Sequence, residues 1–324
     1  MVPGGSRDLL DNPHDHIVNF YDDEADFIAD VGRFLADGMI ADEAVIVVAT
    51  QAHREAIDAS LALSAIDVHD ARGRGRYICL DARETLSGFM VEGSPDRDRF
   101  MAVVGGLIAQ ASDRGRRVRA FGEMVALLWE DGNVSGALEL EVLWNELARE
   151  HRFTLYCAYP MSSIANDDLA AAGRVCDQHS GVVPPASYAS GVSNQIPDAE
   201  IAEQLFVPVP LAARAVRRFT GQTLSAWGMA ELVSDALIVV SELASNVLRH
   251  ASSPFRVSVR RVDEAVRIEV HDLSPALPER RDVALGATNG RGVALVAALS
   301  DKWGTDLRPD GKAVWAVLAA PRLP

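Results

Sequence analysis

Several features that narrow the class of a protein are missing from this chain of 324 residues. No segment approaches the roughly 18 uninterrupted apolar residues that a membrane-spanning helix needs. The first 15 residues are polar and acidic, without the basic and apolar regions of a signal peptide. We therefore expect a cytoplasmic protein with no membrane segment.

Cysteine is scarce as well. Cys79, Cys157 and Cys176 lie far apart in the sequence, and none of them belongs to a C-x-x-C pair or to a local grouping with histidine. Such spacing does not suggest a zinc site. The expectation is three reduced thiols that are mostly buried.

Basic charge is the third scarce feature, since the formal net charge is −15. The acidic excess lies in residues 1–200, which hold 33 acidic and 16 basic side chains. An acidic surface repels phosphate backbones, and no basic stripe offsets it. Direct binding of nucleic acid is not expected.

The length predicts two domains. The clearest shift in composition lies at 184–200, where Pro, Ser, Gly and Asn replace periodic apolar residues. The predicted organisation is a flexible tail at 1–15, a first domain at 16–188, a linker at 189–200 and a second domain at 201–321.

The first domain alternates apolar strands with helical patterns. Strands are predicted at 44–50, 76–80, 117–121 and 153–159, and helices at 24–37, 52–63, 97–113 and 136–150. Strands that are apolar throughout are typical of a parallel sheet covered by helices on both faces. The predicted fold class is α/β.

The second domain has another order of elements. Helices are predicted at 210–221, 229–251 and 291–300, and strands at 255–262, 265–272, 302–307 and 312–319. Two short segments between predicted strands are expected to form hairpin turns: Asp263-Glu264 and Pro309-Asp310-Gly311. This pattern predicts an α+β layer with helices over one antiparallel sheet.

Polar residues in the second domain recur in an order that suits a nucleotide. Glu242 and Asn246 lie one turn apart on the helix at 229–251, where an amide oxygen suits Mg²⁺ and a carboxylate can deprotonate a hydroxyl. Asp272 ends a buried strand and can accept the exocyclic amine of adenine. Gly290-Arg291-Gly292 then opens a helix whose N-terminus suits phosphate oxygens. Each feature alone is common; their order is the informative part.

These motifs resemble the GHKL ATPase superfamily, specifically its anti-sigma-factor serine kinase branch. SELASNVLRHA at 241–251 is similar to the N box, VHDLSPALP at 270–278 to the G1 box, and GRGVALVAALSDKWG at 290–304 with GKAVWAVL at 311–318 to the G2 box and closing strands. The resemblance implies a Bergerat fold over about 201–320.

The resemblance also implies roles for the residues of these boxes. Bound ATP and Mg²⁺ would be held with Glu242 as general base, Asn246 as Mg²⁺ ligand, Asp272 as adenine anchor, and Gly290 and Gly292 in the lid. Arg291 either touches phosphate or is solvated. Ser274 stands where the family usually has a glycine two residues after the G1 aspartate, and Ala313 stands where many relatives have a threonine that helps bind adenine through water. Both differences are expected to weaken nucleotide affinity.

No phosphoacceptor helix hairpin precedes this domain. His179 lies in a short segment that is broken by Pro184 and Pro185, which excludes a histidine kinase hairpin there. The substrate is therefore expected to be external. The resemblance implies a sigma factor or a STAS anti-anti-sigma protein as partner, and a homodimer as a possible assembly.

The first domain resembles the MEDS sensory domain over about 16–188, through HIVNFYDDEADFIADVGRFLADGMIADEAVIVVATQAHREAI at 16–57, LDARETLSGFM, VRAFGEMVALLWEDG, LEVLWNEL and FTLYCAYPM. That family is similar to a RecA/KaiC-type core. After Thr50 this chain has Gln-Ala-His-Arg in place of a phosphate-binding P-loop, so no ATP hydrolysis is expected in this half.

A ligand pocket is expected at the carboxyl ends of parallel strands. The candidate pocket residues are His16, Tyr21, Thr50, His53, Asp81, Glu123 and Tyr159. Trp129 and Trp144 are further candidates, although we expect both to lie in the hydrophobic core. A small organic signal and a protein partner both fit this pocket, and the sequence does not distinguish between them.

Taken together, the motifs predict a signalling switch in which a sensory domain controls an ATP-binding, serine kinase-like domain. The alternative is a non-catalytic, anti-sigma-like binding module whose nucleotide site has decayed. A nucleic-acid-dependent ATPase of the same superfamily is disfavoured by the charge and by the missing transducer domain.

Overall fold

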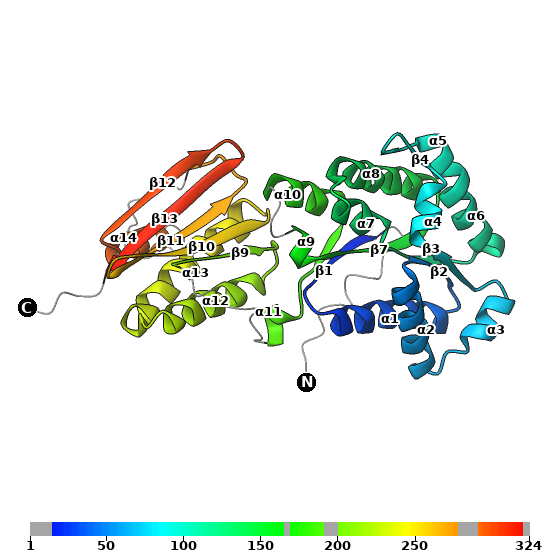
Figure 1. Cartoon of the computed structure of the whole chain (residues 1–324), viewed down its shortest axis with the longest axis horizontal. Coiled ribbons are helices and arrows are strands. Elements are labelled where there is room, and N and C mark those ends of the chain that lie inside the picture. The colour runs from blue at the N-terminus through cyan, green and yellow to red at the C-terminus, as the bar shows by residue number, and fades with distance from the viewer. Residues whose placement is uncertain (1–14, 165–168, 191–199, 278–290, 320–324) are drawn as a thin grey trace, which may run out of the picture. The chain divides into compact units, whose positions relative to one another are not determined.

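The computed structural model of the chain describes residues 15–164, 169–190, 200–277 and 291–319. The chain divides into two compact units, one formed by 1–166 with 174–186 and one formed by 167–173 with 187–324. Figure 1 shows both units, and each is described here by itself.

The N-terminal unit is built on a six-stranded parallel sheet in the order β3-β2-β6-β7-β1-β8. Its strands are β1 (His16–Tyr21), β2 (Ala44–Ala49), β3 (Tyr77–Asp81), β6 (Val118–Gly122), β7 (Phe153–Pro160) and β8 (Gly181–Val183). Most residues of β1, β2, β6 and β7 are buried. Burial on both faces explains why these segments are mostly apolar.

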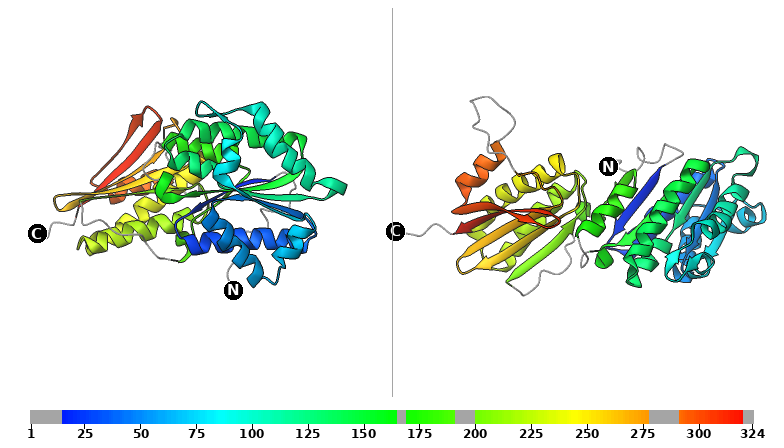
Figure 2. Two further views of the ribbon diagram at one scale, coloured as in Figure 1. Left: turned by 45° about the vertical axis from the view of Figure 1, so that its right-hand side comes forward. Right: turned by 90° about the horizontal axis from the view of Figure 1, so that it is seen from above.

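Helices cover both faces of this sheet, as Figures 1 and 2 show. One layer holds α1 (Glu24–Ile40), α2 (Gln51–Leu63) and α3 (Val68–Gly73). The opposite layer includes α4 (Ala82–Ser87), α5 (Arg97–Phe100), a π-helical stretch (Met101–Gly105), α6 (Gly106–Ala111), α7 (Met124–Glu130), α8 (Val134–Glu150) and, from Arg174 on, α10 (Leu169–Gln178). The unit also contains the short hairpin of β4 (Met90–Val91) and β5 (Ser94–Pro95), a 3-10 turn (Asp113–Gly115) and α9 (Met161–Ile164).

Alternation along β7 assigns its side chains to the two layers. Tyr156 and Ala158 belong to the core that contains Phe27 and Val31 of α1. The intervening residues Cys157 and Tyr159 contact Glu141 of α8 on the other face. The predicted α/β class with a parallel sheet is confirmed.

The C-terminal unit is an antiparallel five-stranded sheet in the order β12-β13-β11-β10-β9. Its strands are β9 (Ile201–Phe206), β10 (Phe255–Val262), β11 (Ala265–Asp272), β12 (Lys302–Arg308) and β13 (Gly311–Ala319). Its helical elements are α11 (Ser187–Ser190), α12 (Ala212–Ala226), a 3-10 turn (Ala230–Leu232), α13 (Val233–His250) and α14 (Arg291–Leu299). The predicted α+β layer and both hairpins are confirmed.

Among the described residues, five strands lie outside the sequence-based assignments: β1, β4, β5, β8 and β9. β1 follows the polar N-terminal tail, and β9 follows the expected linker and pairs with the edge of β10. Short strands of this kind are defined by the neighbour with which they pair, and local pattern alone does not mark them. Within the described residues, no helix is both long enough and apolar enough to span a membrane.

Candidate functional site

Helix α13 carries the first two predicted nucleotide-site residues. Its buried stripe includes Ala236, Val240 and Leu243, and it packs against α12, α14 and the sheet. Glu242 and Asn246 are half-buried on the border of this stripe. Among the described residues, Arg249, one turn further on, donates to the Asn246 amide oxygen at 3.4 Å. The pair is therefore held on a packed helix with its oxygens near solvent.

Gly292 of α14 lies directly against Glu242. A Cβ atom built on Gly292 would come within 2.5 Å of the Glu242 Oε2 atom. This glycine leaves the space that the carboxylate occupies, which explains why a small residue opens α14. The structure thus brings together two motifs that are 50 positions apart in the sequence.

Asp272 ends β11 as predicted, and its carboxylate is only 2% exposed. Its Oδ1 atom accepts from the Lys312 ammonium at 2.8 Å and from the Ser274 backbone amide at 2.8 Å. Lys312 also donates to the Ser274 carbonyl at 3.0 Å. A buried ion pair therefore occupies the carboxylate that was expected to anchor adenine.

The partner of Asp272 on β13 is Lys312, because these two residues are in register. Ala313 is paired with His271 instead. Since successive side chains of a strand point to opposite faces, Ala313 does not face Asp272. The register therefore puts Lys312, and not Ala313, beside Asp272.

Gly311 completes this corner of the sheet. Its φ is 152°, and a Cβ atom there would come within 2.0 Å of the Asp272 carbonyl oxygen. Only glycine permits the β12–β13 turn to pass this close to the end of β11. Of the other predicted site residues, Gly290 and the side chain of Arg291 lie outside the described residues.

In the N-terminal unit, a second group of predicted residues meets at the carboxyl end of the sheet. The Glu123 carboxylate accepts from the Thr50 backbone amide and contacts His53 Nδ1. His53 Nε2 contacts Glu24 at the start of α1. We call Tyr21, Glu24, Thr50, His53 and Glu123 the strand-end cluster.

Tyr21 joins this cluster through stacked rings. Its ring lies 4.2 Å from that of Phe27, which in turn meets the edge of His53 at 5.2 Å between centroids. Burial raises the pKa of Tyr21, and the carboxylates of Glu24, Glu130 and Glu123 raise it further. Asp81 lies beside the cluster, where it caps α4 and pairs with Arg54 at 3.0 Å.

His53 has a carboxylate at each ring nitrogen. The hydrogen bond with Glu123, opposed by burial and aided by the charges of Glu123 and Glu24, raises the pKa of His53 to about 9. A histidine with such a pKa is a cation at neutral pH. The cluster is thus a cation between two acids.

The raised pKa of His53 makes the stability of the N-terminal unit depend on pH. Because the folded pKa lies above the unfolded value of about 6.5, the contribution of His53 is fully present below pH 6.5 and is lost as pH rises through about 9. Urea unfolding of the full chain between pH 6 and 10 is expected to show this loss. His53→Gln should flatten the profile, and His69→Gln at an exposed position is the control; an unchanged profile in His53→Gln would contradict the assignment.

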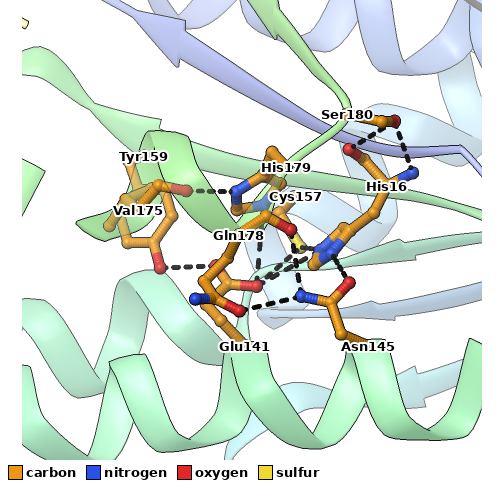
Figure 3. Close-up of polar contacts among 9 residues, drawn as sticks. All are labelled: His16, Glu141, Asn145, Cys157, Tyr159, Val175, Gln178, His179 and Ser180. Atoms are coloured by element: carbon orange, nitrogen blue, oxygen red, sulfur yellow. Dashed lines mark hydrogen bonds and ion pairs between the residues drawn. The ribbon is translucent and has the colours of Figure 1, made fainter. Parts of the chain in front are cut away.

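Besides Asp81, two other predicted pocket residues lie outside the strand-end cluster. His16 begins β1, at the opposite end of that strand from Tyr21. Tyr159 faces α8, where its hydroxyl donates to Glu141 at 2.7 Å. Both belong instead to a buried group with Cys157 and His179, shown in Figure 3. Strand direction separates His16, and the alternation of β7 separates Tyr159.

The tryptophans of this unit are core residues. Trp129 and Trp144 are each 3% exposed. Trp129 packs on Tyr159, and Trp144 packs on Phe100 and Phe153. The cysteines are free thiols, with Cys157 buried and Cys79 and Cys176 partly exposed. Cys157 has two histidine neighbours that its sequence position did not reveal.

Comparison with known proteins supports both resemblances. Residues 15–175 match the MEDS family, the methanogen/methylotroph, DcmR sensory domain, and residues 207–318 match the histidine kinase-like ATPase domain family. Among curated proteins, none matches.

One of the similar solved structures is that of a DnaB-like replicative helicase and its interactions with primase, at 9% identity and a TM-score of 0.38. The likeness covers 60% of this chain and about half, 53%, of the helicase chain. So low a score carries no conclusion about activity or partners. On the two family matches, the chain is a signalling module that joins a MEDS sensory domain to a histidine kinase-like ATPase domain.

Proposed function

We propose that this protein is a switch in which the MEDS domain senses a signal and controls an ATP·Mg²⁺-binding domain that acts on a sigma factor or a STAS anti-anti-sigma protein. The supporting observation is that Gly292 lies against the Glu242 carboxylate, one helical turn from Asn246, on a helix that packs against the G1 strand β11. The two family matches support a signalling role, and the partner class rests on the resemblance of the sequence motifs.

The residues present fit ATP·Mg²⁺ at the phosphate end. Gly292 leaves room for the Glu242 carboxylate, and the hydrogen bond from Arg249 to the Asn246 oxygen is long, at 3.4 Å. At the adenine end, Asp272 is a buried carboxylate that already holds the Lys312 ammonium. An adenine amine would therefore share Asp272 with Lys312 or displace it.

Each residue of this site has a distinct task. Bound ATP supplies the phosphoryl group, and its Mg²⁺ offsets the phosphate charge. Asn246 offers an oxygen of the kind that Mg²⁺ prefers. Glu242 accepts the proton of the incoming serine or threonine hydroxyl, and Gly292 leaves the carboxylate room to do so.

Gly292→Ala tests whether this room matters. The added methyl group would meet Glu242 Oε2 at 2.5 Å, so the carboxylate must move aside. Because alanine favours a helix over glycine by about 1 kcal/mol, stability should not fall. We expect at least a tenfold loss of phosphoryl transfer with an unchanged melting temperature. Full transfer in Gly292→Ala would show that the position of Glu242 is not critical.

The direct test incubates the full chain with radiolabelled ATP, Mg²⁺ and a STAS-domain protein that has a serine or threonine acceptor. Label on the STAS protein supports the proposal, and its loss in Glu242→Gln assigns the transfer to this site. A pull-down with the same STAS protein and with a sigma factor accompanies it. Neither transfer nor binding of either partner would overturn the proposal.

A second function is favoured by the Asp272–Lys312 pair. If Lys312 satisfies Asp272 permanently, the domain binds its partner without nucleotide, as a non-catalytic clamp. Calorimetry with ATP·Mg²⁺ separates the two functions. Heat of binding that disappears in Asp272→Asn supports the ATP-dependent switch, whereas partner binding without any heat from ATP supports the clamp.

A further inference from the structure

The buried group around His16 has the donor atoms of a metal site. His16 at the start of β1, Glu141 on α8, Cys157 on β7 and His179 after α10 each offer one atom, and these atoms lie within 4.8 Å of one another. Figure 3 shows the four side chains converging from separate elements. All four lie in the N-terminal unit and are distinct from the strand-end cluster.

Hydrogen bonds at the outer nitrogens orient both imidazoles. His179 Nδ1 lies 2.6 Å from the Val175 carbonyl, which can only accept, so this nitrogen carries the proton. His16 Nδ1 lies 3.0 Å from Asn145 Oδ1. The Asn145 amide group donates to both oxygens of Gln178 at 3.0 Å, which fixes its oxygen toward His16. A neutral ring of either histidine therefore turns an unprotonated Nε2 inward.

The inward atoms are acceptors that face one another. Glu141 Oε2 lies 3.2 Å from His16 Nε2 and 3.6 Å from His179 Nε2. The His179 side chain is fully buried, and its Nε2 atom has no hydrogen-bond partner among the residues that the structure describes. The single thiol proton of Cys157 can form a hydrogen bond to only one of the three acceptors, which are His16 Nε2, His179 Nε2 and Glu141 Oε2. Buried acceptors without a donor are costly, so the geometry calls for a cation at their centre.

The separations suit a small tetrahedral ion. Metal bonds of about 2.0–2.3 Å hold the ligand atoms roughly 3.3–3.8 Å apart. The Cys157 sulfur lies 3.3 Å from His16 Nε2 and 3.8 Å from Glu141 Oε2, which agrees with this range. The Tyr159 hydroxyl donates to Glu141 Oε1, so Oε2 is the carboxylate oxygen that is available to bind the metal.

The donor set and the charge select the class of ion. Two imidazole nitrogens, one sulfur and one carboxylate oxygen suit Zn²⁺ and similar transition metals, whereas Mg²⁺ and Ca²⁺ prefer oxygen ligands only. A dication balances the charges of the Glu141 carboxylate and the Cys157 thiolate, leaving the buried cluster neutral. Cys157 releases its thiol proton to solvent on binding.

We propose that His16, Glu141, Cys157 and His179 form a closed tetrahedral site for one divalent transition-metal ion of the zinc class. The partners behind the ligands complete it: Asn145 and the Val175 carbonyl orient the histidines, and Tyr159 orients the carboxylate. Four protein ligands are typical of a structural site. The ion ties β1, β7 and α8 to the segment that follows α10.

The test is a titration of the metal-free full chain with Co²⁺, followed by displacement with Zn²⁺. We expect one equivalent of Co²⁺ per chain, with a thiolate-to-cobalt charge-transfer band and the intense visible bands of a tetrahedral ion. Cys157→Ser should abolish the charge-transfer band and weaken binding at least 100-fold. Cys176→Ser, at a nearby thiol outside the cluster, is the matched control and should behave as the wild type.

A further variant keeps the test decisive if Cys157→Ser folds poorly. Asn145→Ala removes only the group that orients His16 and should weaken Co²⁺ binding about 10–100-fold while a tetrahedral spectrum remains. Circular dichroism establishes that each metal-free protein is folded. A folded wild-type chain that takes up no Co²⁺, or a charge-transfer band that persists in Cys157→Ser, would overturn the site. The first result would mean that a protonated His16 pairs with Glu141.

Discussion

Replacing Lys312 with methionine is expected to destabilise the C-terminal unit by about 3–5 kcal/mol, because the buried Asp272 carboxylate loses its cation. The two side chains are 9% and 2% exposed and lie 2.8 Å apart, so little water can replace the ammonium. The methionine keeps most of the volume of the lysine side chain. The effect is therefore one of charge and not of packing.

Urea unfolding followed by tryptophan fluorescence measures this effect, and a double variant is its control. Asp272→Asn combined with Lys312→Met removes both charges and should recover most of the lost stability, since buried ion pairs add little beyond their apolar equivalents. Lys312→Arg keeps the charge but not the shape. A cost below about 1 kcal/mol in Lys312→Met would mean that Asp272 is not dependent on this partner.

The same variants distinguish the two functions proposed for the C-terminal domain. If Asp272 anchors adenine, Lys312→Met frees the carboxylate, and the affinity for ATP·Mg²⁺ should rise while Asp272→Asn abolishes binding. If the domain is a clamp without nucleotide, ATP·Mg²⁺ gives no heat with any variant. Calorimetry at a temperature where each variant is folded separates these outcomes.

The second large effect is expected for Glu242→Gln. If Glu242 is the general base, its loss should lower phosphoryl transfer by about 10²–10⁴-fold, the usual contribution of a positioned base. Binding of ATP·Mg²⁺ should be retained, because the anchor at Asp272 and the ligand Asn246 are unchanged. The transfer assay should therefore show a loss of phosphoryl transfer, whereas calorimetry should show unchanged binding of ATP·Mg²⁺.

Glu264→Gln is the matched control for this variant. Glu264 is exposed in the β10–β11 hairpin, at the opposite end of β11 from Asp272, so its replacement should change neither transfer nor binding. Normal transfer by Glu242→Gln would remove Glu242 from the role of base. Loss of binding in Glu242→Gln would indicate instead that the carboxylate holds the nucleotide or its metal ion.

Much of the candidate site follows from local pattern. Glu242 and Asn246 are neighbours because they are one helical turn apart, and Asp272 ends a strand because the alternation of β11 ends there. Thr50, His53 and Glu123 meet because the carboxyl ends of parallel strands share one edge of a sheet. These placements follow from secondary structure, and the periods of helices and strands can be read directly from the sequence.

Register and long-range contact were beyond such reasoning. Ala313 was expected to take the place of a threonine that helps bind adenine, yet the strand register puts Lys312 beside Asp272 and turns Ala313 to the other face. His16 was expected at the pocket, yet it lies at the opposite end of β1 from the strand-end cluster. No local pattern reports which way a strand runs in the sheet or which residue lies opposite.

By itself, the sequence determined two domains, their α/β and α+β classes, and the order of the nucleotide-site motifs, because each depends on spacing within one element or between neighbours in the chain. Only the tertiary structure decided which side chains share a buried space. Lys312 meets Asp272 across 40 positions, and Cys157 meets His16 across 141. Burial and strand register determine these contacts, and neither can be derived from the spacing of the residues in the sequence.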